Sequence, residues 1–111
     1  MVSAPSAPPA IFAADCAQDG SGGVFRGLHL SQAQAIVRRQ GGQDVVVCGE
    51  DVFANARLAH GIESAVGPCK PDGPHTSLAG ALALPHFQQK APPPEGHTFY
   101  ETPLRKAVQK P

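Results

Sequence analysis

Glycine and proline interrupt this chain so often that only short helices and strands fit between them. The sequence has 12 glycines and 12 prolines among 111 residues. Glycine weakens regular elements and proline breaks them. The chain therefore suits one small domain. No apolar run approaches the roughly 20 residues of a membrane-spanning helix, so we expect a soluble protein with no membrane partner.

Charge and cysteine content exclude several classes of protein. Nine basic residues balance nine acidic ones, so no global field draws the chain to nucleic acid or to an anionic membrane. The three cysteines, Cys16, Cys48 and Cys69, form an odd set without CxxC spacing. This set fits neither a disulfide framework nor a zinc ribbon, and we expect reduced thiols.

Composition changes sharply near residue 23. Residues 1–23 are rich in Ala, Pro, Ser and Gly, a composition typical of flexible linkers. We therefore expect a linker over residues 1–23 and a folded domain over residues 24–111. The domain begins with a short extended segment at residues 24–30.

The first half of the domain predicts a helix, a strand and a second helix. Ser31 is placed as an N-cap, Gln34 completes a capping box, and Gly41 ends the helix. Residues 44–48 are apolar and β-branched, which indicates a central strand buried on both faces. Residues 50–66 return to helical periodicity.

The second half predicts turns and two further strands. Three prolines and three glycines over residues 67–80 exclude a helix there. Residues 82–88 and 97–101 are the expected strands. We therefore predict an α+β fold, with two helices packed on one face of a small, mostly antiparallel sheet. The expected core comprises Ile36, Val37, Val45, Val47, Phe53, Ile62, Phe87 and Phe99.

Three histidines follow similar Pro/Gly phrases at intervals of eleven residues. They are His75 in GPH, His86 in LPH and His97 in EGH. Loop side chains face clefts more often than cores, and imidazole serves as both acid and base near neutral pH. The three residues are therefore candidates for one acid–base set.

Cleavage of RNA without a metal requires a base for the ribose 2′-hydroxyl, an acid for the leaving 5′-oxygen and cations for the phosphorane. His86 and His97 are our expected pair, and this chemistry needs them within about 10 Å of each other. We expect no cofactor and no metal. The predicted catalytic residues are His86, His97, Thr98, Tyr100 and Arg105, and the predicted substrate-binding residues are His75 and Lys106.

Two other chemistries use the same residue types. Three histidines can hold zinc with a position open for water, although the sequence has no HExxH motif. The tripeptide Phe25-Arg26-Gly27 is similar to the arginine-bearing strand with which ADP-ribosyltransferases hold NAD. We interpret the remaining histidines, His29 and His60, as structural.

The segments DVVVCGEDVFANARLAHGIESAVG, ALPHFQ, PPPEGHTFYET and LRKA together resemble the C-terminal effector domains of bacterial polymorphic toxin systems. The resemblance implies a toxin domain that is secreted as part of a larger polypeptide and acts in the target-cell cytoplasm. Many such domains resemble nucleases, and such toxins are typically paired with a cognate immunity protein. The resemblance also implies that His86 and His97 are catalytic, with Thr98, Tyr100 and either Arg105 or Lys106 assisting.

The sequence therefore predicts a secreted antibacterial effector that cleaves RNA by metal-independent, histidine-based acid–base chemistry. The alternatives are a zinc-dependent or NAD-directed toxin, and a non-catalytic interaction module of a secretion system, in which the Pro/Gly loops present a binding surface.

Overall fold

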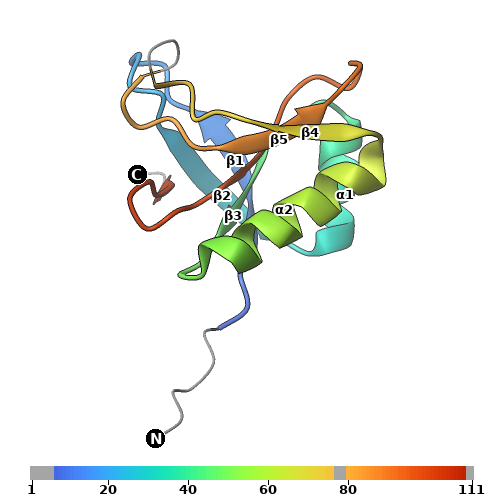
Figure 1. Ribbon diagram of the computed structural model, residues 1–111, viewed down its shortest axis with the longest axis horizontal. Helices are drawn as coiled ribbons and strands as arrows, with labels where there is room; N and C mark the ends of the chain where they lie inside the picture. The colour runs from blue at the N-terminus through green and yellow to red at the C-terminus, as the bar shows by residue number, and fades with distance from the viewer. Residues whose placement is uncertain (1–6, 77–79, 110–111) are drawn as a thin grey trace, which may run out of the picture.

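A computed structural model describes residues 7–76 and 80–109. Within these residues two helices accompany a seven-stranded mixed sheet of order β4-β5-β6-β3-β1-β2-β7 (Figure 1). The predicted α+β class is confirmed, with a larger sheet than expected. The elements are β1 (Ala10–Cys16), β2 (Val24–Leu30), α1 (Gln32–Gln40), β3 (Val45–Cys48), α2 (Val52–Val66), β4 (Cys69–Asp72), β5 (His86–Gln89), β6 (Thr98–Tyr100) and β7 (Val108–Gln109).

Strand β1 corrects the expected extent of the linker. It lies inside the sheet, antiparallel to both β2 and β3, so residues 10–16 belong to the domain. The sequence of β1 has no clear strand pattern, and its pairing with two neighbours stabilises it instead. The backbone of β1 forms hydrogen bonds on both sides, and its Ile11 and Ala14 side chains are buried. Residues 1–6 of the expected linker, and residues 110 and 111 of the expected domain, lie outside the described residues.

The sheet combines local hairpins with long-range parallel pairs. Four of the six strand pairings in the described residues are antiparallel, and β3–β6 and β2–β7 are parallel. The parallel β3–β6 pair sets Val45 beside Thr98. It therefore joins the first half of the domain to the second half at the centre of the sheet.

Local sequence signals explain the helices and the central strand. Ser31 caps α1 and forms the predicted capping box with Gln34. Asp51 caps α2 by accepting bonds from the backbone N–H groups of the first turn. All four residues of β3 are buried, as expected for a central strand covered on both faces. Among the described residues, no helix is long and apolar enough to cross a membrane.

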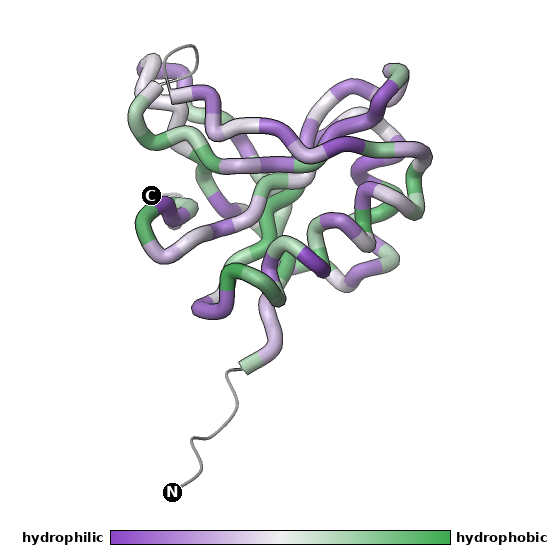
Figure 2. Tube along the Cα trace, in the orientation of Figure 1, coloured by the Kyte–Doolittle hydropathy of each residue, from purple (hydrophilic) through white to green (hydrophobic). Residues whose placement is uncertain are grey.

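The sheet separates two apolar clusters. On one face, α1 and α2 cover Val45, Val47 and Phe87; Figure 1 shows both helices on the same side of the sheet. On the other face, Leu84 and Phe99 pack with Val46, and none of the described residues in this cluster belongs to α1 or α2. We call these the helix face and the loop face. The central strands are the most hydrophobic part of the trace in Figure 2.

Two residues of the expected core are exposed. Val37 is 66% exposed on α1, and Phe53 is 76% exposed at the start of α2. Each helix buries small side chains, Ala35 in α1 and Ala59 in α2. Ala35, Ala59 and Ile62 therefore make the helix contacts with the sheet, and the two exposed residues point away from it.

The helix face buries an ion pair completely. Arg39 of α1 donates from Nε to Glu63 Oε1 of α2 at 2.8 Å and from Nη2 to Oε2 at 3.2 Å. Thr98 Oγ1 donates to Oε1 at 2.7 Å, and Gln89 Nε2 donates to Oε2 at 2.5 Å. Burial opposes ionisation of Glu63, but these donors outweigh it and hold the pKa of the carboxyl below its usual value.

Candidate functional site

Three histidines from separate segments meet on the loop face. The ring centroids of His86 and His97 are 4.5 Å apart, and those of His75 and His86 are 5.3 Å apart. The predicted pair, His86 and His97, therefore meets the distance that acid–base chemistry requires. His75 follows β4, His86 begins β5 and His97 precedes β6.

Sheet register explains this convergence. Antiparallel pairing places Asp72 opposite His86 and His86 opposite Phe99. Directly opposite residues of a sheet share a face, as do residues two apart in a strand. His97 therefore joins Phe99 and His86 on the loop face, and the turn after Asp72 brings His75 to the same place.

The histidines line a cavity of about 210 Å³. This is large enough for one small group, such as a phosphate or a ribose, but smaller than typical pockets for a whole nucleotide-sized ligand. Its lining combines apolar walls with a small number of titratable groups. The lining residues are Cys16, Ala17, Gly22, His75, Ala83, Leu84, His86, His97 and Phe99.

His97 is supported by Asp44, the residue just before β3. Asp44 Oδ1 accepts a bond from the His97 backbone N–H at 2.7 Å and lies 3.5 Å from His97 Nδ1. The ring atom Nδ1 is buried and makes no hydrogen bond at that distance. Burial would raise the pKa of Asp44, but contacts with the ring and backbone of His97 outweigh it and lower the pKa. The carboxylate is thus ionised beside an imidazole with an unused nitrogen.

His75 has a similar arrangement with Asp72. Its Nε2 lies 3.4 Å from Asp72 Oδ1. The backbone N–H of Gly73 donates to Asp72 Oδ1 at 2.8 Å and lowers the pKa of this carboxyl. The side chains of His75 and His97 are both more than a third exposed, at 38% and 39%. Each combines a nearby carboxylate with access to solvent.

His86 differs from its two neighbours because it is only 4% exposed. Its Nδ1 lies 3.3 Å from the carbonyl oxygen of Leu84, and its Nε2 lies 3.1 Å from Gln88 Oε1. Burial and the neighbouring His97 lower the pKa of His86 despite these oxygens. A neutral imidazole has one N–H, so only one ring nitrogen donates and the other keeps a lone pair.

Cys16 lies in the same cavity, where its thiol stays protonated. Its Sγ is 3.8 Å from Asp44 Oδ2. Burial raises the pKa of Cys16, and the negative charge of Asp44 raises it further. Because the thiolate is the nucleophilic form of cysteine, these surroundings do not favour covalent catalysis at Cys16.

Thr98 and Tyr100 lie on the opposite face of the sheet from the histidines. Thr98 is fully buried and bonded to Glu63, and the Tyr100 ring packs against Phe87 at 5.7 Å between centroids. Burial raises the pKa of the Tyr100 phenol. Neither residue lines the cavity, so both of these predicted catalytic residues are placed in the helix-face packing instead.

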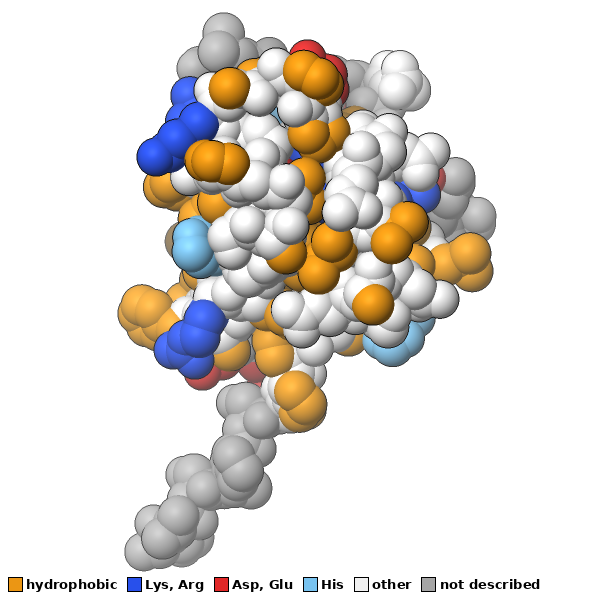
Figure 3. Space-filling model, turned by 90° about the vertical axis from the view of Figure 1, so that its right-hand side faces the viewer, with side chains coloured by type: hydrophobic (Ala, Val, Ile, Leu, Met, Phe, Trp, Pro, Cys, Tyr) orange, Lys and Arg blue, Asp and Glu red, His pale blue; other side chains and the backbone are white. Residues whose placement is uncertain are grey.

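The predicted cationic residues lie outside the cavity lining. Arg105 Nη1 donates to the carbonyl oxygens of Ala81 and Ala83, at 2.9 and 3.1 Å. Since Ala83 lines the cavity, Arg105 holds one of its walls in place. Lys106 is exposed. Figure 3 shows Lys and Arg only at separate places on the face it presents, without a continuous basic patch.

The sequence did not identify the two carboxylates of the site. Asp44 reaches His97 because β3 and β6 start side by side in a parallel pair, and Asp72 reaches His86 through the β4–β5 register. Asp44 is the first residue of the predicted apolar strand at residues 44–48 and immediately precedes the observed β3, and this position is the only local signal. Arg26, considered for NAD binding, stacks on Phe12 at 5.3 Å and is not a cavity residue.

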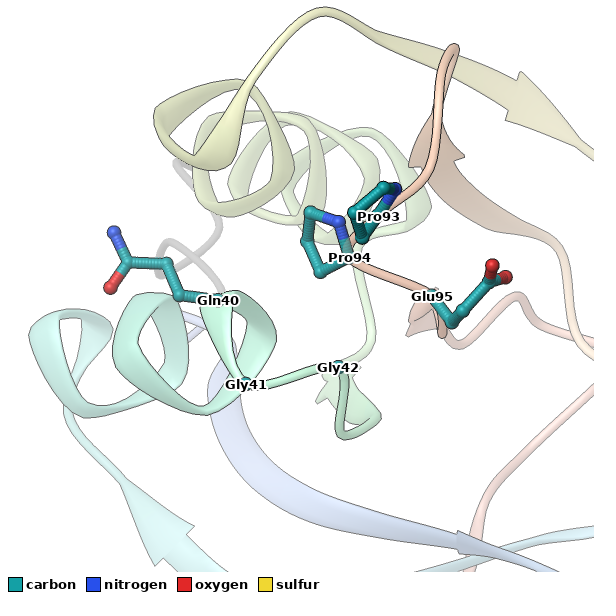
Figure 4. A pocket seen from close by; sticks show the side chains of 6 residues that line it. All are labelled: Gln40, Gly41, Gly42, Pro93, Pro94 and Glu95. Atoms are coloured by element: carbon teal, nitrogen blue, oxygen red, sulfur yellow. The ribbon is translucent and has the colours of Figure 1, made fainter.

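A second hollow lies between the end of α1 and residues 93–95 (Figure 4). It is an open groove formed by Gly41, Gly42, Pro93 and Pro94, with Gln40 and Glu95 at its sides. The side chains of Gln40 and Glu95 point away from each other in Figure 4. The groove therefore lacks the convergent polar groups of the histidine cavity.

Comparisons with protein-family models, with curated proteins and with solved structures give no match for this chain. The chemistry of the histidine cavity is therefore the basis for inferring function.

Proposed function

We propose that this chain is an antibacterial effector domain that cleaves RNA at the histidine cavity by metal-independent acid–base chemistry. The observation that supports the proposal is the convergence of His75, His86 and His97, from three separate segments, on one cavity. Groups that exchange protons with a substrate must lie within hydrogen-bond reach of it. One cavity gives all three imidazoles that opportunity.

The geometry favours His75 and His97 as the pair that exchanges protons with RNA. Both are partly exposed and both lie beside a carboxylate. His86 is buried against the rings of His75, His97 and Phe99 and has oxygen atoms beside both ring nitrogens. In this proposal His86 orients its two neighbours, which differs from the catalytic role that the sequence suggests for it.

The reaction is a transfer within the RNA strand. The neutral imidazole of the pair takes the proton of a ribose 2′-hydroxyl, and the oxygen attacks the adjacent phosphorus. The bond from phosphorus to the 5′-oxygen breaks, and the protonated imidazole gives its proton to that oxygen. The products are a 2′,3′-cyclic phosphate and a free 5′-hydroxyl, and the imidazolium also stabilises the charge of the phosphorane.

A cognate immunity protein and delivery as the end of a larger secreted polypeptide belong to the same proposal. The cavity offers such a partner a simple mode of inhibition, because covering His75 and His97 would exclude RNA. The competing proposal is a non-catalytic interaction module, in which the Pro/Gly loops form the binding surface and the histidines take no part in chemistry.

The test is cleavage of single-stranded RNA by the purified domain in excess EDTA. We expect cleavage that yields cyclic phosphate ends, and a loss of about 100-fold or more in rate for His97→Ala, the usual contribution of a positioned acid or base. His60→Ala is the matched control, because His60 lies on α2 against Phe87. We expect it to retain its rate within about twofold.

Thermal unfolding of both variants would show that each is folded. No cleavage by the folded wild-type domain, or equal rates for His97→Ala and wild type, would overturn the proposal. Growth arrest of bacteria that produce the wild-type domain in the cytoplasm, with intact RNA, would also overturn it and favour another toxic activity. Arrest with degraded RNA would support it.

A further inference from the structure

Asp72, His75 and His86 form a compact set of metal-ligand types at one wall of the cavity. One ligand atom from each residue lies within 4.8 Å of the ligand atoms of the other two. Within the set, His75 Nε2 lies 3.4 Å from Asp72 Oδ1. Tetrahedral zinc with bonds of 2.0–2.2 Å needs ligand atoms about 3.4 Å apart. The separations between the ligand atoms therefore exceed the zinc value by no more than about 1.5 Å.

The fold brings these residues together through one register and one turn. Asp72 and His86 are directly paired between β4 and β5. Gly73 then adopts a positive φ of 72°, and a Cβ at this residue would lie 3.1 Å from His86 Cε1. A larger residue here would be strained and would press on His86. The turn therefore folds His75 back over His86 only with glycine at this position.

The three residues differ in how far the surrounding structure holds their side chains. His86 is buried and held by β5, whereas the side chains of Asp72 and His75 are 37% and 38% exposed. The partly exposed side chains of Asp72 and His75 can therefore move the short distance toward His86 that binding of a metal ion requires.

We propose that Asp72, His75 and His86 bind a divalent transition-metal ion, with zinc as the representative ion. Two imidazoles and one carboxylate are a ligand set that zinc accepts, and three protein ligands leave one position for water. The second ring nitrogen of His86 lies beside an oxygen acceptor whichever nitrogen binds the ion. Such a partner orients a metal-binding imidazole.

This site has a consequence that rests on the proposed function. His75 would exchange protons with RNA in the metal-free domain, and a bound ion would occupy one of its nitrogen lone pairs. Zinc would therefore inhibit metal-independent cleavage. The metal site itself does not depend on that activity, because it is defined by three ligands and measured by binding.

The binding test uses the whole chain, without a histidine tag and after treatment with a chelator. Titration calorimetry with zinc should give one ion per chain. We expect at least tenfold weaker binding in Asp72→Asn and in His75→Ala, with wild-type affinity in the His60→Ala control. Both altered side chains are partly exposed, so these variants keep the buried His86 and should fold. Equal affinity of all four proteins would overturn the site.

Cobalt distinguishes this ligand set from the cysteines. Co²⁺ should give visible absorption of a four-coordinate ion without the near-ultraviolet band of a cobalt–thiolate bond. A thiolate band that disappears in Cys16→Ser would overturn the proposed ligands, because Cys16 lines the same cavity. Retention of the visible bands in Cys16→Ser would support them.

Cleavage of RNA with and without zinc separates the two proposals. Zinc binding in a domain that does not cleave RNA would support the metal site and overturn the proposed function. Cleavage in EDTA by a domain that binds no zinc would support the function and overturn the site. Activity that requires zinc would support the site and overturn the metal-independent mechanism.

Discussion

The buried Glu63 carboxylate on the helix face and the His97 ring on the loop face differ in how many of their hydrogen-bonding positions are used. On the helix face, the Glu63 carboxylate receives four hydrogen bonds from the side chains of Arg39, Gln89 and Thr98. On the loop face, His97 Nδ1 is buried without a hydrogen bond. A saturated network stabilises the fold, and an unsatisfied group has binding capacity left for a substrate or an ion. Asn55 Oδ1 on α2 is also buried without a partner but does not line the histidine cavity, so an unsatisfied atom marks a candidate site only where it meets a cavity.

The largest expected effect comes from breaking the saturated network. Arg39→Met leaves the Glu63 carboxylate buried without its cation, and we expect a loss of about 3–5 kcal/mol in the free energy of unfolding. His97→Ala on the loop face should cost less than about 1 kcal/mol. Urea unfolding of both variants measures the contrast.

A double variant controls for misfolding of Arg39→Met. Arg39→Met with Glu63→Leu removes both charges, and replacement of a buried ion pair by apolar residues is often neutral. We expect the double variant to recover much of the lost stability. Similar losses for Arg39→Met and His97→Ala would contradict the contrast between the two faces.

Local signals were sufficient to predict the start of α1 and the buried central strand. The capping box of Ser31 and Gln34 begins α1 as expected, and the buried strand lies at residues 45–48. These features depend on neighbouring residues in the chain, which a sequence displays directly. The predicted fold class followed from them.

Features that depend on distant pairing were not predictable. Strand β1 looks like the end of a linker in sequence, and only its pairing with β2 and β3 makes it a strand. In the same way, Asp44 lies beside His97 only because β3 and β6 pair in parallel. The exposed position of Phe53 depends on how α2 is rotated against the sheet, where Ala59 and Ile62 occupy the contact.

The next effect tests where Thr98 acts. Thr98→Val keeps the shape of the side chain but removes the bond to Glu63 Oε1, so we expect a loss of about 1.5–3 kcal/mol, typical of a bond to a charged group. Under conditions where both proteins are fully folded, the rate of RNA cleavage by Thr98→Val should stay within about twofold of the wild-type rate. A large loss of cleavage rate in a folded Thr98→Val variant would show that Thr98 takes part in catalysis, as the sequence predicted.

Strand alternation already separates Thr98 from His97. In a strand covering residues 97–101, adjacent side chains point to opposite faces, so His97 and Phe99 cannot share a face with Thr98 and Tyr100. The sequence prediction grouped His97, Thr98 and Tyr100 because their chemistry suited RNA cleavage. The predicted strand was itself a reason to divide them.

Acid should weaken the helix face through Glu63. Its pKa is lowered in the folded chain, so the unfolded chain takes up the proton first as the pH falls. The stabilisation is complete above the ordinary carboxyl pKa of 4.5 and is lost as the pH falls toward the folded-state value. One such group contributes a slope of at most about 1.4 kcal/mol per pH unit.

Glu63→Gln identifies this contribution. The variant should be less stable than wild type at pH 7, and its stability should fall less steeply in acid, as measured by urea midpoints over the acidic range. Parallel pH profiles for the two proteins would show that Glu63 does not carry the acid sensitivity, and the network would then be less important than its hydrogen bonds indicate.

The smallest expected effect is that of Tyr100→Phe, and it sharpens the assignment of the two faces. The change removes only the phenol oxygen and keeps the ring that packs on Phe87. We expect a change in unfolding free energy within about 0.5 kcal/mol and no change in cleavage rate beyond about twofold. Loss of cleavage in this folded variant would mean that RNA reaches the helix face. Because Thr98→Val should lower stability and Tyr100→Phe should not, the pair separates the saturated network from simple packing within one strand.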